Sequence, residues 1–477
     1  MKKLKLRGKE LYKLGYPEGK AISLAINIIL ANFRRSDKQK AMETLEDIIQ
    51  NQDKYRKHNI YGPIVAALNP SLNSIKNKET GKTGEKIILK TKHQDYIAYG
   101  INDVEQEAIH QMETAMKLPI TVKGALMADA HQGYGLPIGG VLATQNAIIP
   151  YGVGMDIGCR MCLTVYGIAP SYIEGSKARL KNMLEECTSF GKNAGVEGKK
   201  DHEVMDRKIF SEIPVLKEYK STAYKQLGSS GSGNHFVDIG IVELKTANVF
   251  DVPEGQYLGV LSHSGSRRLG AAIATYYTRV AKQKCRLPKG AQELAWLDLS
   301  SQEGVEYWEA MNLAGDYSKA CHEIIHKKIS KYLGERPIIE VENHHNFAWR
   351  EQLEDGNIVI VHRKGATPAQ NDVLGVIPGS MTTPAFIVRG KGNPDSIYSA
   401  SHGAGRKMSR SRAKQSFTKK DLNQALQNAG VTLIGGGTDE APMAYKDIIR
   451  VMKFQKDLVG QEGIFYPKIV KMSGDQK

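Results

Sequence analysis

Apolar residues recur at helical spacing near the start of the chain. Between residues 17 and 35 they return every three or four positions, and Pro17 suits a first helical turn. A second helix is expected after Ser36 or Asp37, either of which can cap it. The apolar faces of these two helices are Ala21, Leu24, Ala25, Ile28 and Ile29, then Ala41, Leu45, Ile48 and Ile49. Both helices are short, so tertiary packing must stabilise them.

The pattern changes at about residue 89, after a polar loop that runs from residue 69 to 86. Short β-branched runs separated by Gly/Ser loops predict strands at 141–143, 258–261, 337–341, 357–361 and 431–434. Longer periodic stretches predict helices at 104–118, 173–186, 271–283, 304–332 and 420–429. Strands and helices do not alternate strictly, so the pattern favours an α+β fold with mixed sheets surrounded by helices. Residues 1–88 then form an N-terminal helical extension, or a helical layer packed on the main domain of residues 89–477.

The charge of the chain is basic and unevenly distributed. There are 66 Lys and Arg against 51 Asp and Glu, a net charge of +15, and residues 1–88 alone hold 18 against 9. Such a balance favours a polyanionic partner, nucleic acid or an anionic membrane, over a neutral one. A well-solvated, lysine-rich surface would give the same composition.

The cysteines and the N-terminal residues indicate in which cellular compartment the protein is expected. Five cysteines at positions 159, 162, 187, 285 and 321 are too irregular for a disulfide framework. The first ten residues, MKKLKLRGKE, lack the apolar segment of a signal peptide. The apolar stretch at 21–30 is too short to span a bilayer. We therefore expect a soluble cytoplasmic protein without a membrane partner.

A glycine turn places a carboxylate near a thiol in the segment YGVGMDIGCRMC, residues 151–162. Asp156 and Cys159 flank this turn, and a thiolate with a carboxylate alongside suits Mn or Zn. Two alternatives stay open. Cys159 and Cys162 could form half of a zinc knuckle, although the chain has no second Cys-x-x-Cys, or Cys159 could be a buried structural residue.

Three further motifs place histidines where apolar strands meet polar loops: GSGNHFVD at 231–238, LSHSGSRR at 261–268 and ENHHN at 342–346. Any one of these histidines could simply be hydrogen-bonded in its loop. Together they give a candidate two-metal set of Asp156, Cys159, His235, His263 and His345. Because successive strand side chains point apart, His235 and Asp238 can share a site only at a bulge or a strand end. For the same reason we expect only one ligand from His344 and His345.

The motif SHGAGRKMSR at 401–410 combines a histidine with a flexible turn and two arginines. Neutral imidazole can attack phosphorus, which makes His402 a candidate nucleophile, although a structural or phosphate-binding histidine would fit the same motif. Arg406 and Arg410 are spaced one turn apart, as at a helix start that holds anions. Upstream, Arg363 and Lys364 add cationic charge and the segment PGSM at 378–381 adds further phosphate donors.

Nine motifs in order resemble the RtcB family of RNA-splicing ligases, over residues 95 to 471. They are MADAHQGYGLPIGG, GVGMDIGC, GSGNHF, HSGSR, HHNF, HRKGAT, PGSM, SHGAGRKMSRS and DEAPMAYKDI. Any one of these motifs is weak, but their shared order makes coincidence an unsatisfactory explanation. The resemblance implies a GTP- and Mn²⁺-dependent enzyme that joins RNA 3′-phosphate or 2′,3′-cyclic phosphate ends to 5′-hydroxyl ends, in RNA repair or tRNA splicing. An accessory activator protein is a further partner to consider.

The resemblance also implies roles for single residues. His402 would carry GMP as a phosphoramidate, and the five candidate ligands would bind two Mn²⁺ ions. The implied nucleotide-binding residues, besides His402, are Asn234, Asp238, Ser380, Ala404, Gly405, Tyr445 and Lys471. RNA phosphates would be held by Arg363, Lys364, Arg406 and Arg410, and Asp129 would support the site.

Some positions depart from the family's pattern. Asp238 stands where the family usually has Glu, and Arg268 and Pro368 replace the commoner Gly and Arg. The segment after Met381 also differs, so the chain looks like a divergent branch. Two other functions therefore stay open: an enzyme that caps nucleic-acid 3′-phosphates with GMP without sealing, and a non-catalytic RNA-binding relative.

Overall fold

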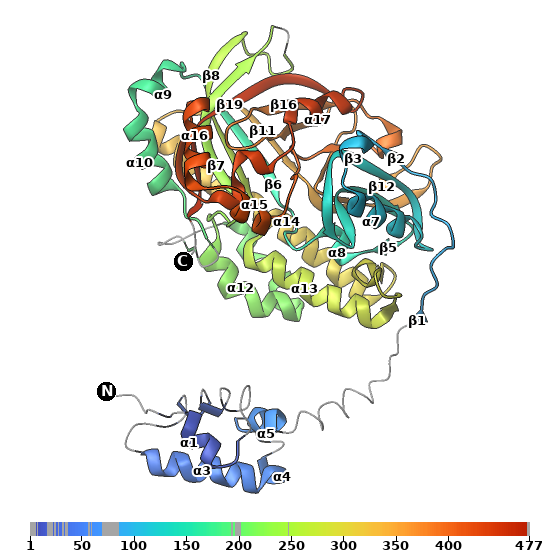
Figure 1. Cartoon of the computed structure of the whole chain (residues 1–477), viewed down its shortest axis with the longest axis vertical. Coiled ribbons are helices and arrows are strands. Elements are labelled where there is room, and N and C mark those ends of the chain that lie inside the picture. The colour runs from blue at the N-terminus through green and yellow to red at the C-terminus, as the bar shows by residue number, and fades with distance from the viewer. Residues whose placement is uncertain are drawn as a thin grey trace. The chain divides into compact units, whose positions relative to one another are not determined.

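The structure is a computed structural model in which contacts divide the chain into two units, Met1–Thr83 and Gly84–Lys477 (Figure 1). In the second unit it describes residues 85–474 apart from 192–193, 196–201 and 247. In the first it describes residues 6, 8–16, 22, 25–26, 28–30, 33, 37–55, 58 and 60–68. Each unit is considered by itself.

The first unit is helical where it is described. Its helices are α1 (Gly8–Lys13), α3 (Lys38–Gln50), α4 (Gln52–Tyr55) and α5 (Gly62–Leu68). The predicted face of α3 is buried at Ala41, Leu45 and Ile48, and Asp37 is its N-cap residue without a side-chain capping bond. Of the helix predicted for 17–35, residues 22, 25, 26 and 28–30 are helical, and the remainder lies largely outside the described residues, as does Ser36.

The second unit is built on two mixed sheets, which confirms the predicted α+β class. The large sheet has the order β11-β6-β8-β7-β19-β16-β15, with β18 paired to β19 in parallel. Its strands are β6 (Arg160–Tyr166), β7 (Phe236–Leu244), β8 (Gly255–Ser264), β11 (Pro337–His344), β15 (Leu374–Ile377), β16 (Ala385–Gly390), β18 (Thr432–Gly436) and β19 (Val459–Gly474). The second sheet has the order β12-β13-β4-β3-β2. Its strands are β2 (Ile97–Ala98), β3 (Thr121–Tyr134), β4 (Leu136–Thr144), β12 (Asn346–Gln352) and β13 (Ile358–Lys364).

Short strand pairs and helices complete this unit. The pairs join β1 (Glu85–Lys86) to β9 (Cys285–Arg286), β5 (Ala147–Ile148) to β10 (Leu297–Asp298), and β14 (Ala366–Pro368) to β17 (Ser399–Ser401). The helices are α7 (Gln106–Met116), α8 (Pro150–Val153), α9 (Ser171–Gly175), α10 (Lys177–Cys187), α11 (Ile209–Glu212), α12 (Pro214–Gln226), α13 (Arg267–Lys284), α14 (Gln302–Leu333), α15 (Arg410–Ser416), α16 (Lys419–Ala429) and α17 (Ile448–Phe454). The helix predicted for 173–186 is divided at Ser176, which separates α9 from α10.

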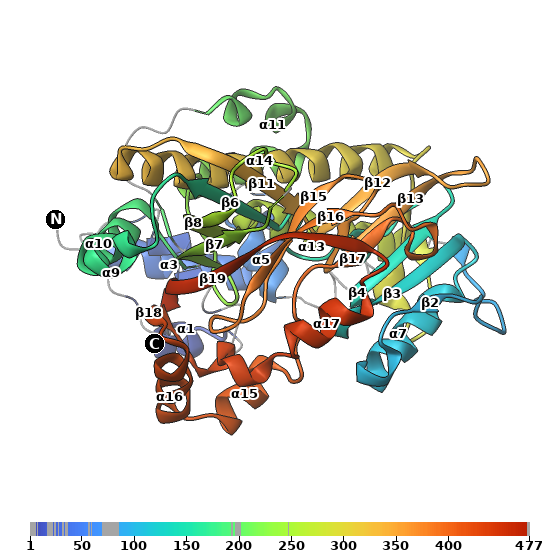
Figure 2. The ribbon, with the colours of Figure 1, turned by 90° about the horizontal axis from the view of Figure 1, so that it is seen from above.

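The large sheet has a different environment on each face. Alternation along β6 sends Met161, Leu163 and Val165 into one apolar cluster, and Tyr166 into another that includes Ile325 of α14. Figure 2 shows α14 running beside β11 and β6. The strands therefore present one set of side chains to α14 and the opposite set to the other face. In the described part of the chain, none of the helices combines the length and apolar character that a membrane span requires.

Candidate active site

Strand ends bring four of the five predicted metal ligands to one place. Cys159 immediately precedes β6, His235 immediately precedes β7, and His263 lies one residue before the end of β8. His345 is the single residue between β11 and β12. Because β6 lies between β11 and β8 in the large sheet, these ends are neighbours. His235 lies just outside β7, so the alternation of side chains along the strand does not fix its direction. A strand end was one of the two positions at which His235 and Asp238 could share a site.

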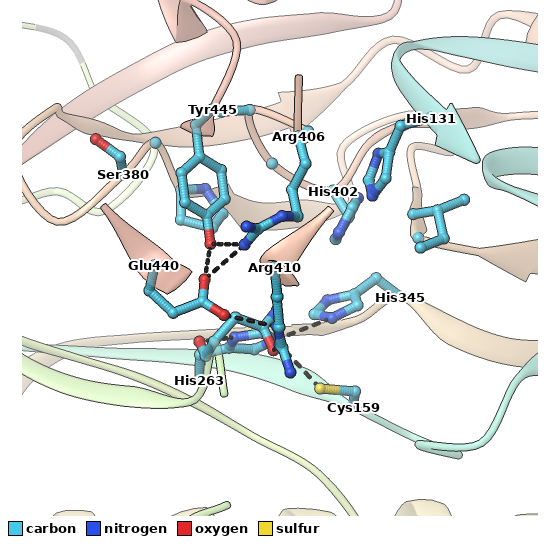
Figure 3. Close-up of a pocket in the computed structure, with 18 of the residues that line it drawn as sticks. His131, Cys159, His263, His345, Ser380, His402, Arg406, Arg410, Glu440 and Tyr445 are labelled. Atoms are coloured by element: carbon cyan, nitrogen blue, oxygen red, sulfur yellow. Dashed lines mark hydrogen bonds and ion pairs between the residues drawn. The ribbon is translucent and has the colours of Figure 1, made fainter. Parts of the chain in front are cut away.

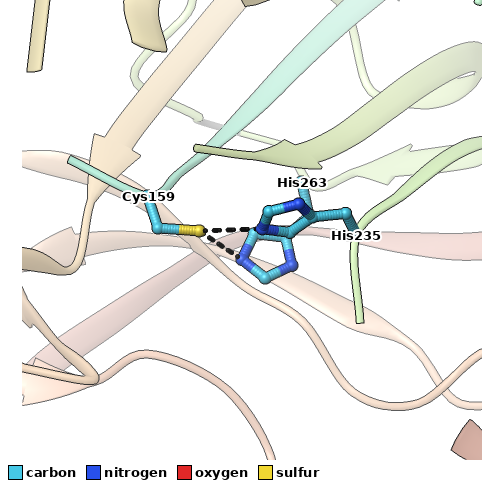
Figure 4. A group of neighbouring side chains, drawn as sticks. All are labelled: Cys159, His235 and His263. Atoms are coloured by element: carbon cyan, nitrogen blue, oxygen red, sulfur yellow. Dashed lines mark hydrogen bonds between the residues drawn. The ribbon is translucent and has the colours of Figure 1, made fainter. Parts of the chain in front are cut away.

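The ligand atoms of the cluster are close to one another. The Sγ atom of Cys159 is 3.4 Å from Nε2 of His235 and 3.1 Å from Nε2 of His263 (Figure 4). The Nε2 atom of His263 is also 3.2 Å from Nε2 of His345. Asp156 joins the group because its Oδ2 atom is 2.9 Å from Nε2 of His235. The glycine at 265 leaves room for this carboxylate, since a Cβ there would lie 2.1 Å from Asp156 Oδ1.

The protonation of this cluster suits a divalent cation. The Nδ1 atom of His263 lies 3.0 Å from the carbonyl oxygen of Asn234, which only accepts, so Nδ1 carries the proton. The lone pair of Nε2 therefore faces Cys159 and His345. Burial, with the charge of His235 beside it, lowers the pKa of His263 to about 3, so this imidazole is neutral. Nitrogen, sulfur and oxygen donors that converge in this way fit Mn or Zn.

His402 is held beside this cluster by a buried carboxylate. Its Nδ1 atom lies 2.7 Å from Oδ2 of Asp129, and its backbone N–H donates to the same oxygen at 3.1 Å. Asp129 has no exposed surface. Burial would raise its pKa, but the hydrogen bond and charge of His402, with His131 and Lys446, outweigh burial and place the pKa below its ordinary value. The His402 ring lies 4.9 Å from that of His345, centroid to centroid.

The turn after His402 needs its glycine. Gly405 has a φ of +74°, and a Cβ there would lie 2.0 Å from the carbonyl oxygen of Asp129. Any other residue at position 405 would therefore adopt an unfavourable backbone conformation, and its Cβ would clash with the backbone of Asp129 in β3. The Gly-Ala-Gly turn thus brings His402 and Asp129 together.

A cavity of about 1180 Å³ opens over both groups of residues. His402 and four of the five candidate ligands, all but His235, line it. Figure 3 shows His402 with Cys159, His263 and His345, the two arginines and Tyr445. The nucleotide residues suggested by the sequence that also line it are Asn234, Asp238, Ser380, Ala404, Gly405 and Tyr445. The volume is slightly above the range usual for small-molecule sites, about 300–1,000 Å³.

Comparison with known proteins identifies the family. A family model described as tRNA-splicing ligase RtcB matches residues 111–471 of the chain. The chain belongs to the RtcB family. It is 33% identical to the RNA-splicing ligase RtcB of Escherichia coli (strain K12), over 75% of this chain and 91% of the relative. It is 30% identical to the tRNA-splicing ligase RtcB of Methanococcus maripaludis, over 78% and 91%, and 31% identical to that of Thermococcus kodakarensis, over 73% and 87%.

Two residues that the sequence suggested for the site do not line the cavity. Lys471 pairs with Val237, whereas its neighbour Val470 pairs with Asp238. The side chain of Lys471 therefore points to the face of the sheet opposite to that of Asp238. Its Nζ atom donates to the carbonyl oxygens of Leu184 and Thr188, and it does not line the cavity, although Val470 and Met472 do. Lys471 therefore does not face the cavity in this structure, and its base-reading role stays a prediction.

Arg363 is not available to RNA either. It is completely buried, and its guanidinium forms a two-pronged ion pair with Glu351 at 2.6 and 2.9 Å. It also lies over the Trp349 ring at 4.6 Å and donates to Ser399. The predicted phosphate contact of Arg363 is wrong, because strand alternation in β13 sends this residue inward. Its neighbour Lys364 does line the cavity, where burial lowers its pKa to about 7 and its Nζ donates to the backbone carbonyl oxygens of Tyr134 and Tyr151.

The two arginines after His402 differ in place and in partners. The helix α15 begins at Arg410, so Arg406 lies before it and not one turn along it, as the spacing had suggested. Arg406 lies 5.0 Å over the Tyr445 ring, and its Nη1 atom is 2.8 Å from Oε2 of Glu440. Arg410 is half exposed, and reaches Glu440 at 2.7 Å and Asn234 Oδ1 at 3.1 Å. Arg410 is therefore the better placed of the two for an incoming phosphate.

Three residues of the site belong to the RtcB-like motifs, but the sequence alone suggested no role for them. Glu440 is buried and ties Arg406, Arg410 and Tyr445 together. His131 has its Nδ1 atom 3.1 Å from the carbonyl oxygen of Asp129, and burial lowers its pKa to about 4. The Lys446 ammonium donates to the carbonyl oxygens on either side of Asp129. Their presence in motifs MADAHQGYG and DEAPMAYKDI was the only available signal.

Proposed function

We propose that this RtcB-family chain is an RNA ligase that joins RNA 3′-phosphate or 2′,3′-cyclic phosphate ends to 5′-hydroxyl ends through a His402–GMP intermediate, with GTP and Mn²⁺. Its curated relatives are named RNA-splicing or tRNA-splicing ligases. The observation that carries the proposal is the pairing of His402 Nδ1 with Asp129 Oδ2 at 2.7 Å, beside the ligand cluster. This pairing leaves Nε2 as the nitrogen able to attack phosphorus.

The reaction would proceed in three transfers. First, the lone pair of His402 Nε2 attacks the α-phosphorus of GTP, so that an N–P bond forms and pyrophosphate leaves. Second, an oxygen of the RNA 3′-phosphate attacks that phosphorus, which breaks the N–P bond and leaves the RNA end carrying GMP. Third, the 5′-hydroxyl attacks the RNA 3′-phosphorus, its proton is lost, GMP leaves and a phosphodiester remains. A cyclic phosphate would first be hydrolysed to a 3′-phosphate.

The residues around His402 have separate tasks in this scheme. Asp129 accepts the Nδ1 proton, which holds the ring in one orientation and stabilises the positive charge that develops as Nε2 attacks. Asp156, Cys159, His235, His263 and His345 would hold two Mn²⁺ ions, which supply positive charge next to the phosphates. Arg410, with Lys364, would hold the phosphates of RNA.

Guanine recognition is assigned to Asp238, and this gives a pH-dependent prediction. Burial raises the pKa of Asp238 well above its ordinary value, and Oδ1 has no hydrogen-bond partner among the described residues. Guanine offers two N–H donors, which favour the carboxylate, so nucleotide binding must release the proton of the free protein. We therefore expect the KM for GTP to fall as pH rises toward the raised pKa. Asp238→Asn cannot ionise and should flatten this dependence, raising KM about 10- to 100-fold.

Measuring guanylylation against GTP and ATP concentration across a pH series tests this assignment. The matched control is Asp355→Asn, because Asp355 is exposed in the turn before β13. An Asp238→Asn protein that keeps both its pH dependence and its preference for GTP would remove Asp238 from the base-reading role.

The end-joining assay distinguishes the proposed ligase from a capping enzyme. An RNA pair with one 3′-phosphate and one 5′-hydroxyl end should yield a joined strand when GTP and Mn²⁺ are present. Strands that carry GMP but are never joined would favour capping without sealing. Absence of both products would favour a non-catalytic RNA-binding relative.

We also propose that residues 89–477 form a cytoplasmic catalytic domain and that the basic residues 1–88 extend its RNA surface. Each phosphate neutralised by a Lys or Arg adds to the salt dependence of RNA binding. Removing residues 1–83 should therefore reduce the slope of log affinity against log salt, while guanylylation by GTP is retained. RNA binding measured over a salt series checks this, and an unchanged slope would exclude the contribution.

A further inference from the structure

A second group of metal-binding side chains lies between the large sheet and α14. Cys162 of β6 pairs with Glu342 of β11 on one side and with Ser262 of β8 on the other. These three residues form one row across three strands. They lie on the face of the sheet that packs against α14, because Ser262 Oγ contacts two histidines of that helix.

The two histidines, His322 and His326, are spaced four residues apart and so share one face of α14. Both are buried, whereas Cys162 is partly exposed. One ligand atom from each of the three residues lies within 4.8 Å of the other two. An HxxxH pair with a thiol on the facing strand is a compact set of nitrogen and sulfur donors, which zinc-class ions prefer.

The hydrogen bonds fix which nitrogens face inward. Nε2 of His322 lies 3.4 Å from the carbonyl oxygen of Ser264, which only accepts, so the proton is on Nε2 and the Nδ1 lone pair points to Ser262 Oγ at 2.7 Å. Nδ1 of His326 is 2.9 Å from Thr164 Oγ1, and this contact fits a protonated Nδ1 when the Thr164 hydroxyl donates to Tyr166. That leaves the Nε2 lone pair of His326 facing Ser262 Oγ, also at 2.7 Å.

Two buried lone pairs therefore meet one hydroxyl, which carries a single proton. The hydroxyl of Ser262 is also within 3.5 Å of the Cys162 carbonyl oxygen, a further acceptor. In this tautomer only one of the two imidazoles can accept the Ser262 proton, whereas a His326 proton on Nε2 would satisfy both. A cation among the three side chains would take both lone pairs, and the outer partners of both imidazoles are compatible with the metal-binding tautomer.

We propose that Cys162, His322 and His326 bind a zinc-class divalent ion that fastens α14 to the back of the large sheet. This site is separate from the cluster in the cavity, because Ser262 and His263 are adjacent in β8 and point to opposite faces. The positive charge of Arg160, which acts on this group, is neutralised by Glu342 at 2.8 Å. Cys162 is the partly exposed member, so the ion has a route in from solvent.

The proposal is tested with Co²⁺ as a spectroscopic probe in full-length Cys159→Ser protein, which lacks the thiolate of the cavity cluster. A thiolate-to-cobalt charge-transfer band should appear, and Zn²⁺ should displace it. Adding Cys162→Ser or His326→Gln should abolish the band, whereas Cys187→Ser should leave it, because Cys187 lies outside both clusters. Absence of a band in Cys159→Ser protein, or a band that survives Cys162→Ser, overturns the proposal.

A second measurement covers the case in which the double variants do not fold. Alkylation of Cys162 in the Cys159→Ser protein is followed by peptide mass spectrometry with and without Zn²⁺. Protection of Cys162 by Zn²⁺, with no protection of Cys187, is the expected result. Equal alkylation of Cys162 under both conditions overturns the proposal. Neither measurement depends on RNA joining, so the result is independent of the proposed ligase function.

Discussion

Replacing His402 by alanine is expected to abolish the transfer of GMP from GTP to the protein. The imidazole is the only nucleophile in the proposed scheme, so no weaker route to the same adduct exists, and the loss should be about 10⁴-fold or more. RNA joining should be lost with it. The measurement is labelling with GTP that carries the label on its α-phosphate, in the presence of Mn²⁺, followed by peptide mapping of the adduct.

The adduct itself provides a second criterion. A phosphoramidate is labile to acid and stable to base, so the label on the wild-type protein should be lost in mild acid. His110→Ala is a suitable control, because His110 is exposed on α7 and does not line the cavity. Equal labelling of wild-type and His402→Ala protein, or an adduct that maps to another peptide, would refute the nucleophile assignment.

The local sequence pattern was sufficient to suggest candidate site residues where these residues lie at strand ends and in turns. Asp156, Cys159, His235, His263 and His345 each belong to a motif at the end of an apolar run, and the structure brings all five together. Periodicity located α7, α13, α14 and α16 of the second unit because their apolar faces are regular, but it missed the thirteen-residue α12. It did not predict the division at Ser176 or the length of β19, whose sixteen residues include charged and polar positions.

The two assignments that the structure places outside the cavity have one physical origin, which is strand parity. Lys471 and Arg363 were chosen from motifs without knowledge of which face of the strand they occupy. A shift of one residue along a strand reverses the face, so Val470 and Met472 line the cavity while Lys471 leaves it. Arg363 likewise turns inward, while Lys364 reaches the cavity.

Tertiary contacts could not be read from the sequence at all. His322 and His326 lie in a helix far from Cys162 along the chain, and only the packing of α14 on β6 and β8 places the three together. Glu440 is a similar case, because its structural role depends on its contacts with Arg406, Arg410 and Tyr445. Ordinary helical or loop positions become sites only when the fold supplies partners.

Asp129→Asn is expected to slow guanylylation by on the order of 10²- to 10⁴-fold while GTP binding changes little. The amide has nearly the shape of the carboxylate and can still accept the N–H of His402, so the ring stays in place. What is lost is the negative charge beside Nδ1, which stabilises the ring as Nε2 becomes bonded to phosphorus. An amide can also turn its NH₂ group toward Nδ1, which would select the tautomer that lacks a free Nε2 lone pair.

The informative measurement is therefore the single-turnover rate of adduct formation, taken separately from the affinity for GTP. A fall in rate at constant affinity identifies Asp129 as a residue that orients the His402 ring and stabilises the positive charge that the ring develops. Asp355→Asn controls for the loss of an exposed carboxylate. Unchanged single-turnover rates would mean that the 2.7 Å contact only anchors the turn, and a loss of GTP affinity alone would place Asp129 in nucleotide binding. Because Asp129 is fully buried, circular dichroism must first show that the variant keeps the wild-type fold.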